Sequence, residues 1–115
     1  MDTEKMKNIK NANFNIGQVV KHKYYPFRGV VFDIDPEYSN TDEYLMSIPQ
    51  KIRPTKDQPF YHLLAENSET EYIAYVSEQN LELDDSDEPI NHDEINNIFS
   101  EYIDGSYKLL NNLKH

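Results

Sequence analysis

Apolar and polar residues alternate over four short runs of the chain, which is the pattern of β-strands with two distinct faces. Val, Ile, Tyr and Phe are frequent in these runs. The four predicted strands cover residues 18–24, 27–35, 60–66 and 71–77. Residues 67–70, Asn-Ser-Glu-Thr, have the length of a hairpin loop, so we expect the last two strands to pair in antiparallel fashion.

The faces of the predicted strands indicate a sheet that is covered on both sides. One face of the second strand is formed by Arg28, Val30, Phe32 and Ile34. The last two strands carry apolar residues on both faces, which is typical of strands inside a closed or wrapped sheet. The fold class that follows is mainly β, a small antiparallel β-barrel of four or five strands.

A long insertion separates the second predicted strand from the third, and we expect one short helix in it. Asn40 is the predicted N-cap, and Glu43 follows three residues later, which is the spacing of a capping box. The helix runs through residues 44–46 and ends before Pro49. Loops of this length in compact domains are usually functional or disordered, and the aromatic and proline residues of this loop favour an ordered one.

After the fourth strand, an acidic linker at residues 84–89 leads to a predicted C-terminal α-helix. Its apolar stripe, at the i, i+3, i+4, i+7 spacing, consists of Ile95, Ile98, Phe99 and Tyr102. Asn91 and Glu94 have the capping-box spacing, and Gly105 suits the C′ position that follows a helix.

The length of 115 residues allows one domain of ordinary size. We expect a flexible N-terminal arm at residues 1–13, the barrel at 14–83, and the acidic linker with a C-terminal helix that packs on the barrel at 84–115. No run approaches the roughly 18 consecutive apolar residues of a membrane helix, and the first residues lack the apolar core of a signal peptide. The absence of Cys excludes disulfides and thiolate metal sites. The expected location is therefore cytoplasmic.

Charge is distributed unevenly along the chain, whose formal net charge is −10 at pH 7. Residues 1–30 carry a net charge of +4, whereas residues 61–115 carry −11. The summed field should repel polyanions, so broad binding to nucleic acids or anionic membranes is disfavoured. Partner proteins that present basic or unfolded segments are compatible with this charge.

No group of residues predicts a catalytic, cofactor or metal site. One candidate is a trio of carboxylates, Asp33, Asp35 and Glu37, which could bind a hard cation or act as an acid–base pair. A solvated acidic face is the favoured interpretation. A calcium loop needs Gly at its turn, and here Pro36 occupies that position. The histidines lack the spacing of a zinc site; they are His22, His62, His92 and His115. The sequence also lacks a nucleophile motif and a glycine-rich phosphate loop. We therefore expect a protein that is not an enzyme.

The segment from Lys21 to Arg28 interleaves cations with aromatic rings. Such a pattern can stack nucleic-acid bases and contact phosphates, or it can hold a peptide through cation–π contacts. The alternative is a turn between two strands, whose rings enter the core and whose cations are solvated.

Four runs of the sequence resemble one known family, over about residues 14–110. They are residues 25–36 (YPFRGVVFDIDP), 47–49 (SIP), 53–67 (RPTKDQPFYHLLAEN) and 72–81 (YIAYVSEQNL). Long ungapped runs of this kind are similar to the YccV-like (HspQ) heat shock proteins, also called hemimethylated DNA-binding proteins. Two sites depart from the family: Tyr44 and Leu45 stand where a bulkier aromatic pair including Trp is expected, and Asp87 stands where Gly is expected.

The resemblance implies a cytoplasmic stress protein with a small SH3-like β-barrel and no catalytic residues. Its implied role is that of an adaptor or specificity enhancer for the Lon protease. In that role it promotes the degradation of denatured proteins, or of regulators such as the replication initiator DnaA. The alternative role is the binding of hemimethylated DNA at the replication origin. The resemblance also implies a homo-oligomer such as a trimer.

Two surfaces are candidates for partner contacts, in addition to the acidic tail after Asp84. They comprise part of the aromatic–basic segment and part of the insertion, namely Lys21, Lys23, Tyr24, Tyr25, Phe27, Arg28, Tyr44 and Ile48. DNA binding would use the cations of the first surface together with those of the arm, Lys5, Lys7 and Lys10. So few phosphate contacts imply a shallow dependence of affinity on salt.

Overall fold

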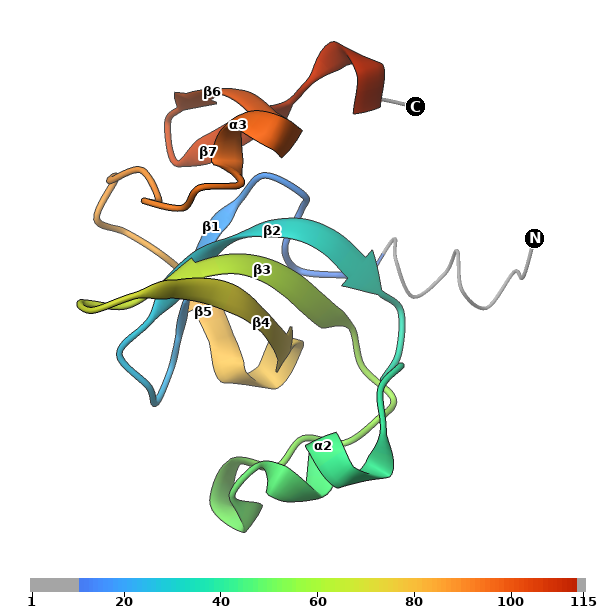
Figure 1. Ribbon diagram of the computed structural model, residues 1–115. Helices are drawn as coiled ribbons and strands as arrows, with labels where there is room; N and C mark the ends of the chain where they lie inside the picture. The colour runs from blue at the N-terminus through green and yellow to red at the C-terminus, as the bar shows by residue number, and fades with distance from the viewer. Residues whose placement is uncertain (1–10, 114–115) are drawn as a thin grey trace.

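The computed structural model describes residues 11–113, which form a five-stranded antiparallel sheet with a two-stranded hairpin above it (Figure 1). The strand order of the larger sheet is β4-β3-β2-β1-β5. Its strands are β1 (Val19–His22), β2 (Arg28–Asp35), β3 (Phe60–Glu66), β4 (Glu71–Ser77) and β5 (Leu81–Leu83). The hairpin consists of β6 (Phe99–Ile103) and β7 (Ser106–Leu109). Most of the predicted N-terminal arm, residues 1–10, lies outside the described residues.

All four strands predicted from the alternation are present, and the mainly β, antiparallel class is confirmed. β3 and β4 have the predicted bounds, and the Asn67 N–H donates to the carbonyl of Thr70 at 3.0 Å across their hairpin loop. The fifth strand, β5, pairs with β1. Because β4 and β5 are the two edges of the sheet and do not pair, the described sheet does not close into a barrel.

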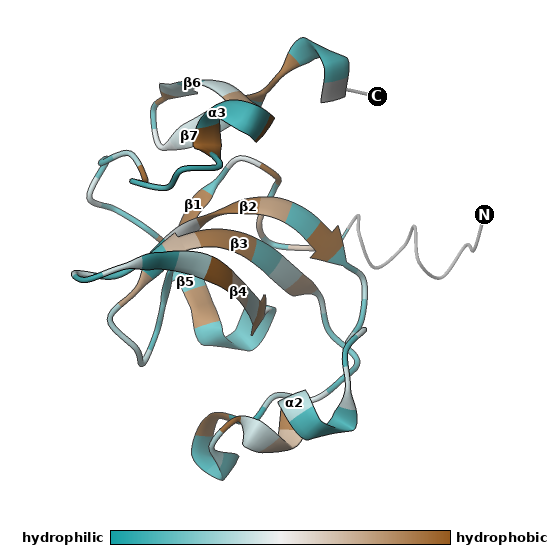
Figure 2. Ribbon diagram, viewed as in Figure 1, coloured by the Kyte–Doolittle hydropathy of each residue, from teal (hydrophilic) through white to brown (hydrophobic). Residues whose placement is uncertain are grey.

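Apolar side chains form two clusters on opposite faces of the curved sheet, because alternate residues of β1, β2 and β3 point to opposite sides. Figure 2 shows the apolar character of these strands. The first cluster contains Phe14, Val20, Val31, Tyr61, Leu63, Ala65, Val76 and Leu81. The second, beneath the hairpin, contains Val19, Val30, Leu64, Ile90, Phe99 and Tyr107. The sheet is therefore covered on both faces.

A register shift in β2 changes which of its residues share a face. The pairing with β3 shifts between Val31 and Asp33. Val30 and Phe32 pack together in the second cluster, as predicted, but Ile34 packs in the first cluster with Val31. The prediction that Ile34 shares the face of Val30 was therefore wrong, because a β-bulge adds one residue and reverses the alternation beyond it.

The prediction of a C-terminal helix was also wrong. Helix α3 (Ile95–Ile98) has only four residues, and the backbone becomes extended at Phe99, where β6 begins. Asp104 and Gly105, with φ of 52° and 82°, form the turn between β6 and β7, so Gly105 is a hairpin residue and not a helix C′ residue. The predicted apolar stripe nevertheless packs into the second cluster, because a helical turn followed by a strand places its side chains on the same core.

The hairpin is bound to the main sheet through Gly17 and Val19. The Tyr107 N–H donates to the Gly17 carbonyl at 2.7 Å, and the Val19 N–H donates to the Gly105 carbonyl at 3.3 Å. In addition, the Tyr107 hydroxyl accepts a hydrogen bond of 2.8 Å from the backbone N–H of Ile90. These hydrogen bonds keep the hairpin packed on the sheet, and the apolar side chains of the second cluster lie between the two.

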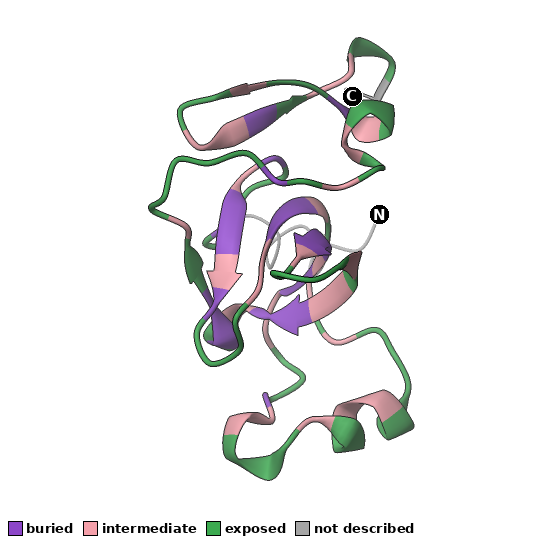
Figure 3. Ribbon diagram, turned by 60° about the vertical axis from the view of Figure 1, so that its left-hand side comes forward, coloured by how far each residue is buried: buried purple, intermediate pink, exposed green. Residues whose placement is uncertain are grey.

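The insertion between β2 and β3 lies on the opposite side of the sheet from the hairpin (Figure 1). It contains α2 (Asp42–Ser47) and a 3-10 helix, η1 (Gln50–Ile52), and none of the residues of these helices is buried (Figure 3). The short helix is confirmed, but its N-cap is Thr41, whose Oγ1 accepts from the Tyr44 N–H at 3.1 Å. Asn40 was predicted as the cap; its side chain accepts instead from the Thr41 N–H.

Two further 3-10 helices are η2 (Glu78–Asn80), which joins β4 to β5, and η3 (Asn111–Leu113). Among the helices within residues 11–113, none has the length and apolar character needed to cross a membrane.

Candidate functional site

The aromatic–basic segment forms a tip, residues 23–27, between β1 and β2, and His22 organises it. His22 Nδ1 accepts hydrogen bonds from the backbone N–H groups of Tyr24 and Tyr25, each 3.0 Å long. The imidazole stacks on the ring of Tyr25 at 4.8 Å between centroids and lies 5.1 Å from the ring of Phe27. Two donors at Nδ1 require a neutral ring with its proton on Nε2. Burial, in turn, lowers the pKa of His22 from 6.5.

Arg28 has a structural role, because its guanidinium makes hydrogen bonds both to β3 and to the acidic linker. Its Nη1 donates to Glu66 Oε1 at 3.1 Å and to the Pro89 carbonyl at 3.2 Å, and its Nη2 donates to Asp84 Oδ2 at 3.0 Å and to the Glu88 carbonyl. The side chain is only 20% exposed. The guanidinium therefore ties the acidic linker to the sheet and has little capacity left for a phosphate.

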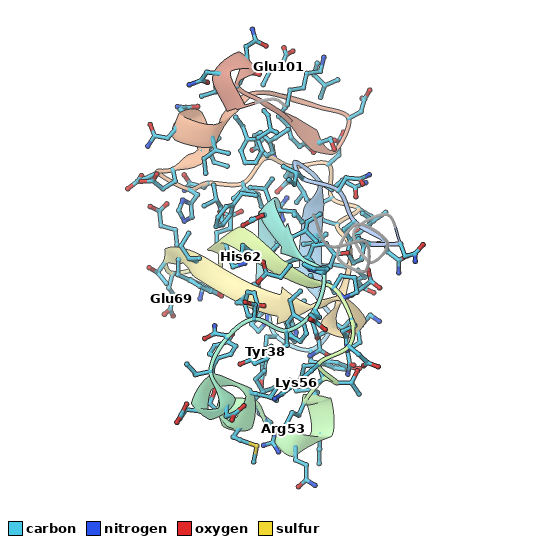
Figure 4. The ribbon with its side chains drawn as sticks, turned by 90° about the vertical axis from the view of Figure 1, so that its right-hand side faces the viewer. Tyr38, Arg53, Lys56, His62, Glu69 and Glu101 are labelled. Carbon is cyan, nitrogen blue, oxygen red and sulfur yellow. The ribbon has the colours of Figure 1, made fainter. Side chains whose placement is uncertain are left out.

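Three of the other six Lys and Arg residues within residues 11–113 are in ion pairs as well, namely Lys21, Lys56 and Lys108. Lys21 Nζ lies 3.7 Å from Glu82 and 3.5 Å from Asp85. In the insertion, Lys56 pairs with Asp42 at 3.2 Å and lies over the ring of Tyr38 (Figure 4). Lys23 has no ion pair within residues 11–113. The predicted basic surface is thus largely neutralised by neighbouring carboxylates.

Two aromatic residues of the tip, Tyr25 and Phe27, by contrast, line a groove together with the insertion and β4. The third, Tyr24, was also predicted as a partner contact, but it is exposed and does not line this groove. The volume of the groove is about 340 Å³, and its walls are mainly apolar. We define the aromatic groove by Tyr25, Phe27, Tyr44, Ile48, Tyr72 and Ser77. Four of these residues were predicted as partner contacts, and the structure brings them together from two segments that are far apart in the sequence. Tyr72 and Ser77 were not predicted, because a single sequence does not show which part of β4 faces the tip.

A hydrogen bond from Tyr44 attaches the insertion to β4 beside the groove, and hydrogen bonds from Arg53 hold the insertion together internally. The Tyr44 hydroxyl donates to the Tyr75 carbonyl of the edge strand β4 at 2.8 Å, and burial raises the pKa of Tyr44. The Arg53 guanidinium donates to the Ile48 carbonyl at 2.9 and 3.1 Å and to the Met46 carbonyl at 3.0 Å. Figure 4 labels Arg53 within the lower segment. The groove wall formed by Tyr44 and Ile48 is therefore built into the fold, as the prediction of an ordered loop required.

The rim and the floor of the groove differ in character. Ile73, which also lines the groove, is 56% exposed, and Tyr25 is 44% exposed. At the end of β4, Ser77 is 2% exposed, and its Oγ has no hydrogen-bond partner among the described residues. An exposed apolar rim around a buried polar group with no partner is typical of a binding site.

A second polar cluster lies on the sheet and includes two carboxylates of the trio considered in the sequence, Asp33 and Asp35. His62 Nε2 lies 3.1 Å from Asp35 Oδ2, which also accepts from the Tyr75 hydroxyl at 2.8 Å. Burial, with a further contribution from the Asp35 carboxylate, raises the pKa of Tyr75 well above its usual value. Asp33, Asp35 and His62 could together hold a metal ion, while Glu37 lies outside this group. Pairing of Asp33 with His62 between β2 and β3 creates the cluster, and the sequence alone did not show that register.

Comparison with known proteins gives a family for the chain. Residues 12–106 match the family described as "Hemimethylated DNA-binding protein YccV like". The chain is also similar to F-box only protein 21 of Mus musculus, Pongo abelii and Homo sapiens, with 30% identity over 99 residues in each case. The match covers 85% of this chain but only 15 or 16% of those proteins, so the chain spans a small part of their length. No solved structure matches the chain.

The family match bears out the resemblance seen in the sequence and covers the sheet, the insertion, the tip and most of the C-terminal hairpin. It includes every residue that defines the aromatic groove. The chain belongs to the YccV-like family of hemimethylated DNA-binding proteins.

Proposed function

We propose that the protein is a non-enzymatic binding module that holds an exposed apolar segment of a partner protein in the aromatic groove. In this way it acts as an adaptor or specificity enhancer for Lon-type proteolysis. Its clients are denatured proteins or regulators such as the replication initiator DnaA, as the family resemblance suggests. The observation that carries the proposal is the groove itself, whose aromatic walls and exposed rim at Ile73 are fixed by the fold.

Two physical arguments support a protein as the partner. Denatured proteins expose aromatic and aliphatic side chains, and burying such a side chain in an apolar groove stabilises a complex by roughly 1.5–3 kcal/mol. The net charge of −10 favours encounter with basic segments and disfavours encounter with polyanions. The ion pairs of Lys21 and Arg28 reduce the positive surface further.

A reconstituted degradation assay tests this proposal. Lon and a denatured client are incubated with and without the full chain, and the rate of client degradation is measured. We expect the chain to increase that rate, and we expect Ile73→Thr to weaken the effect about fivefold, because about 1 kcal/mol of apolar burial at the rim is lost. Ile103→Thr is the matched control, since Ile103 is also an exposed strand residue but lies in the hairpin.

Unchanged degradation rates in the presence of the chain would reject the adaptor role. Equal loss of activity in both variants would show that the groove is not the contact surface. The predicted homo-oligomer and the cytoplasmic location stay predictions, which the mass in solution and cell fractionation test.

Binding of hemimethylated DNA is the second candidate function, and the family description favours it. Among the predicted contacts, Lys23 is exposed and unpaired within the described residues, so it is the residue on which this function would depend. Electrophoretic shifts with hemimethylated and fully methylated duplexes at moderate salt test it. A preference for the hemimethylated duplex that Lys23→Ala abolishes would support DNA binding, whereas equal, weak binding to both duplexes would indicate only non-specific attraction.

A further inference from the structure

The hydroxyl of Ser77 is an unusual feature of the aromatic groove. Ser77 is the last residue of β4, lines the groove, and is 2% exposed. Its Oγ has no hydrogen-bond partner within residues 11–113. Buried polar groups in folded proteins nearly always have a partner. A ligand that enters the groove can supply the missing one.

A second polar group of the groove limits what that ligand is. His22 lines the groove, and its Nδ1 already accepts two backbone hydrogen bonds. Its proton must therefore lie on Nε2, which has no hydrogen bond to any residue in the described part of the chain. An N–H group can only donate, whereas the Ser77 hydroxyl can donate or accept.

The walls and the size of the groove restrict the ligand further. Tyr25, Phe27, Tyr44 and Tyr72 supply aromatic surfaces, which favour another ring in an edge or offset arrangement. A volume of about 340 Å³ is at the lower end for ligand sites, so it suits a single side chain and not a packed helix. The ligand is therefore a ring with a polar group that can accept from His22 Nε2 and can pair with the Ser77 hydroxyl.

We propose that the aromatic groove binds a tyrosine side chain in an extended, basic segment of the partner protein, with Ser77 as the hydrogen-bond partner of the tyrosine hydroxyl. This inference rests on the proposed function and names the side chain that the site selects. Phenylalanine would fill the same walls but leave Ser77 unpaired. The tryptophan N–H could donate to Ser77 but could not accept from His22 Nε2. The basic flanks follow from the net charge of −10.

A peptide titration followed by NMR of the full chain tests this inference. The probes are acetyl-Lys-Tyr-Lys-amide and acetyl-Lys-Phe-Lys-amide, and the variants are the wild-type chain and Ser77→Ala. We expect the tyrosine peptide to bind the wild type about fivefold more tightly than the phenylalanine peptide. Ser77→Ala should remove this preference and leave the affinity of the phenylalanine peptide unchanged. Because Ser77 Oγ has no partner in the described chain, the variant should fold with unchanged thermal stability, which a melting curve checks.

The outcomes separate this inference from the function on which it rests. Equal affinity of the two peptides for the wild type, with shifts at the amides of β4, would overturn the tyrosine preference and leave the groove as a protein-binding site. A preference that persists in Ser77→Ala would overturn the role of Ser77. Absence of any shift at β4 with either peptide would overturn both the inference and the proposed function.

Discussion

His22 and Tyr25 are held together twice, once through a hydrogen bond and once through their rings. The Tyr25 N–H donates to His22 Nδ1 at 3.0 Å, and the two rings stack with an angle of 24° between their planes. Because Tyr25 lines the aromatic groove, the shape of the groove depends on a neutral imidazole. Protonation of Nδ1 would replace an acceptor with a donor that faces two N–H groups.

We therefore predict that stability depends on pH through His22. Its pKa in the folded state lies below 6.5, because burial disfavours the charged ring. The unfolded chain then binds the proton more readily, so the stability contribution is fully present above pH 6.5 and is lost as the pH falls from 6.5 to the folded pKa. Each unit of difference between the two pKa values corresponds to about 1.4 kcal/mol. Urea unfolding at several pH values measures this contribution to the free energy of unfolding. The wild type is compared with His22→Asn, which keeps a hydrogen-bond acceptor but does not titrate.

The pH prediction has a clear contrary result. If the wild type and His22→Asn lost the same stability between pH 7 and pH 5, another group would be responsible. An imidazole NMR titration of His22 with a midpoint at or above 6.5 would also contradict the prediction.

A pair of glycines tests how closely the hairpin approaches the sheet. Both Gly17 and Gly105 have positive φ, at 95° and 82°. A Cβ at Gly17 would lie 2.1 Å from the Tyr107 carbonyl oxygen, whereas a Cβ at Gly105 would meet nothing within 4 Å. We expect Gly105→Ala to destabilise the fold by about 1–2 kcal/mol through its φ alone, and Gly17→Ala by about 4 kcal/mol or more. Equal losses for the two variants in urea unfolding would mean that the hairpin is not docked on Gly17.

Arg28 should matter more for stability than for partner binding. We expect Arg28→Met to destabilise the fold by about 3 kcal/mol, because Glu66 and Asp84, with side chains 18% and 7% exposed, lose their shared partner. Lys108→Met, which breaks an ion pair whose two members are each 56% exposed, should cost about 0.5 kcal/mol or less. Thermal unfolding of the wild type, Arg28→Met and Lys108→Met measures the two losses of stability. Full stability of Arg28→Met, together with lost DNA binding, would instead place Arg28 in a DNA interface.

The sequence predicted four of the five strands of the main sheet, because these four follow simple alternation and end at clear turn residues, but it did not predict β5. It did not predict the C-terminal hairpin. The spacing of the apolar residues there fits a helix, but it fits a helical turn followed by a strand equally well; these residues are Ile95, Ile98, Phe99 and Tyr102. The Asp104–Gly105 pair was the available signal, because this dipeptide favours the positive φ values of a tight hairpin turn.

The candidate site was predicted in part. Tyr25, Phe27, Tyr44 and Ile48 were chosen as aromatic or apolar residues of two candidate segments. A single sequence does not show that these two segments meet against β4. The roles of the cations were not predictable for the same reason, because the carboxylates that pair with Arg28 lie more than 35 residues away.

Asp87, which stands where the family resemblance led us to expect Gly, makes a contact that composition did not suggest. Asp87 has a φ of 56°, in the left-handed region where Gly is favoured and Asp is tolerated. Its Oδ1 accepts a hydrogen bond of 2.8 Å from the Tyr102 hydroxyl, and burial with this carboxylate raises the pKa of Tyr102 to about 12. The acidic side chain therefore contributes a contact to the hairpin in addition to its charge.

Hydrogen exchange of the full chain, measured with and without a reduced and alkylated client protein that cannot refold, tests the binding role of the groove most directly. Tip residues 23–27, the edge strand β4 and residues 44–52 border the groove, so they should gain protection together when the client is present. The hairpin β6–β7 should keep its exchange rates. Protection confined to the hairpin, or no change in the three groove segments at saturating client, would show that the groove does not bind the client.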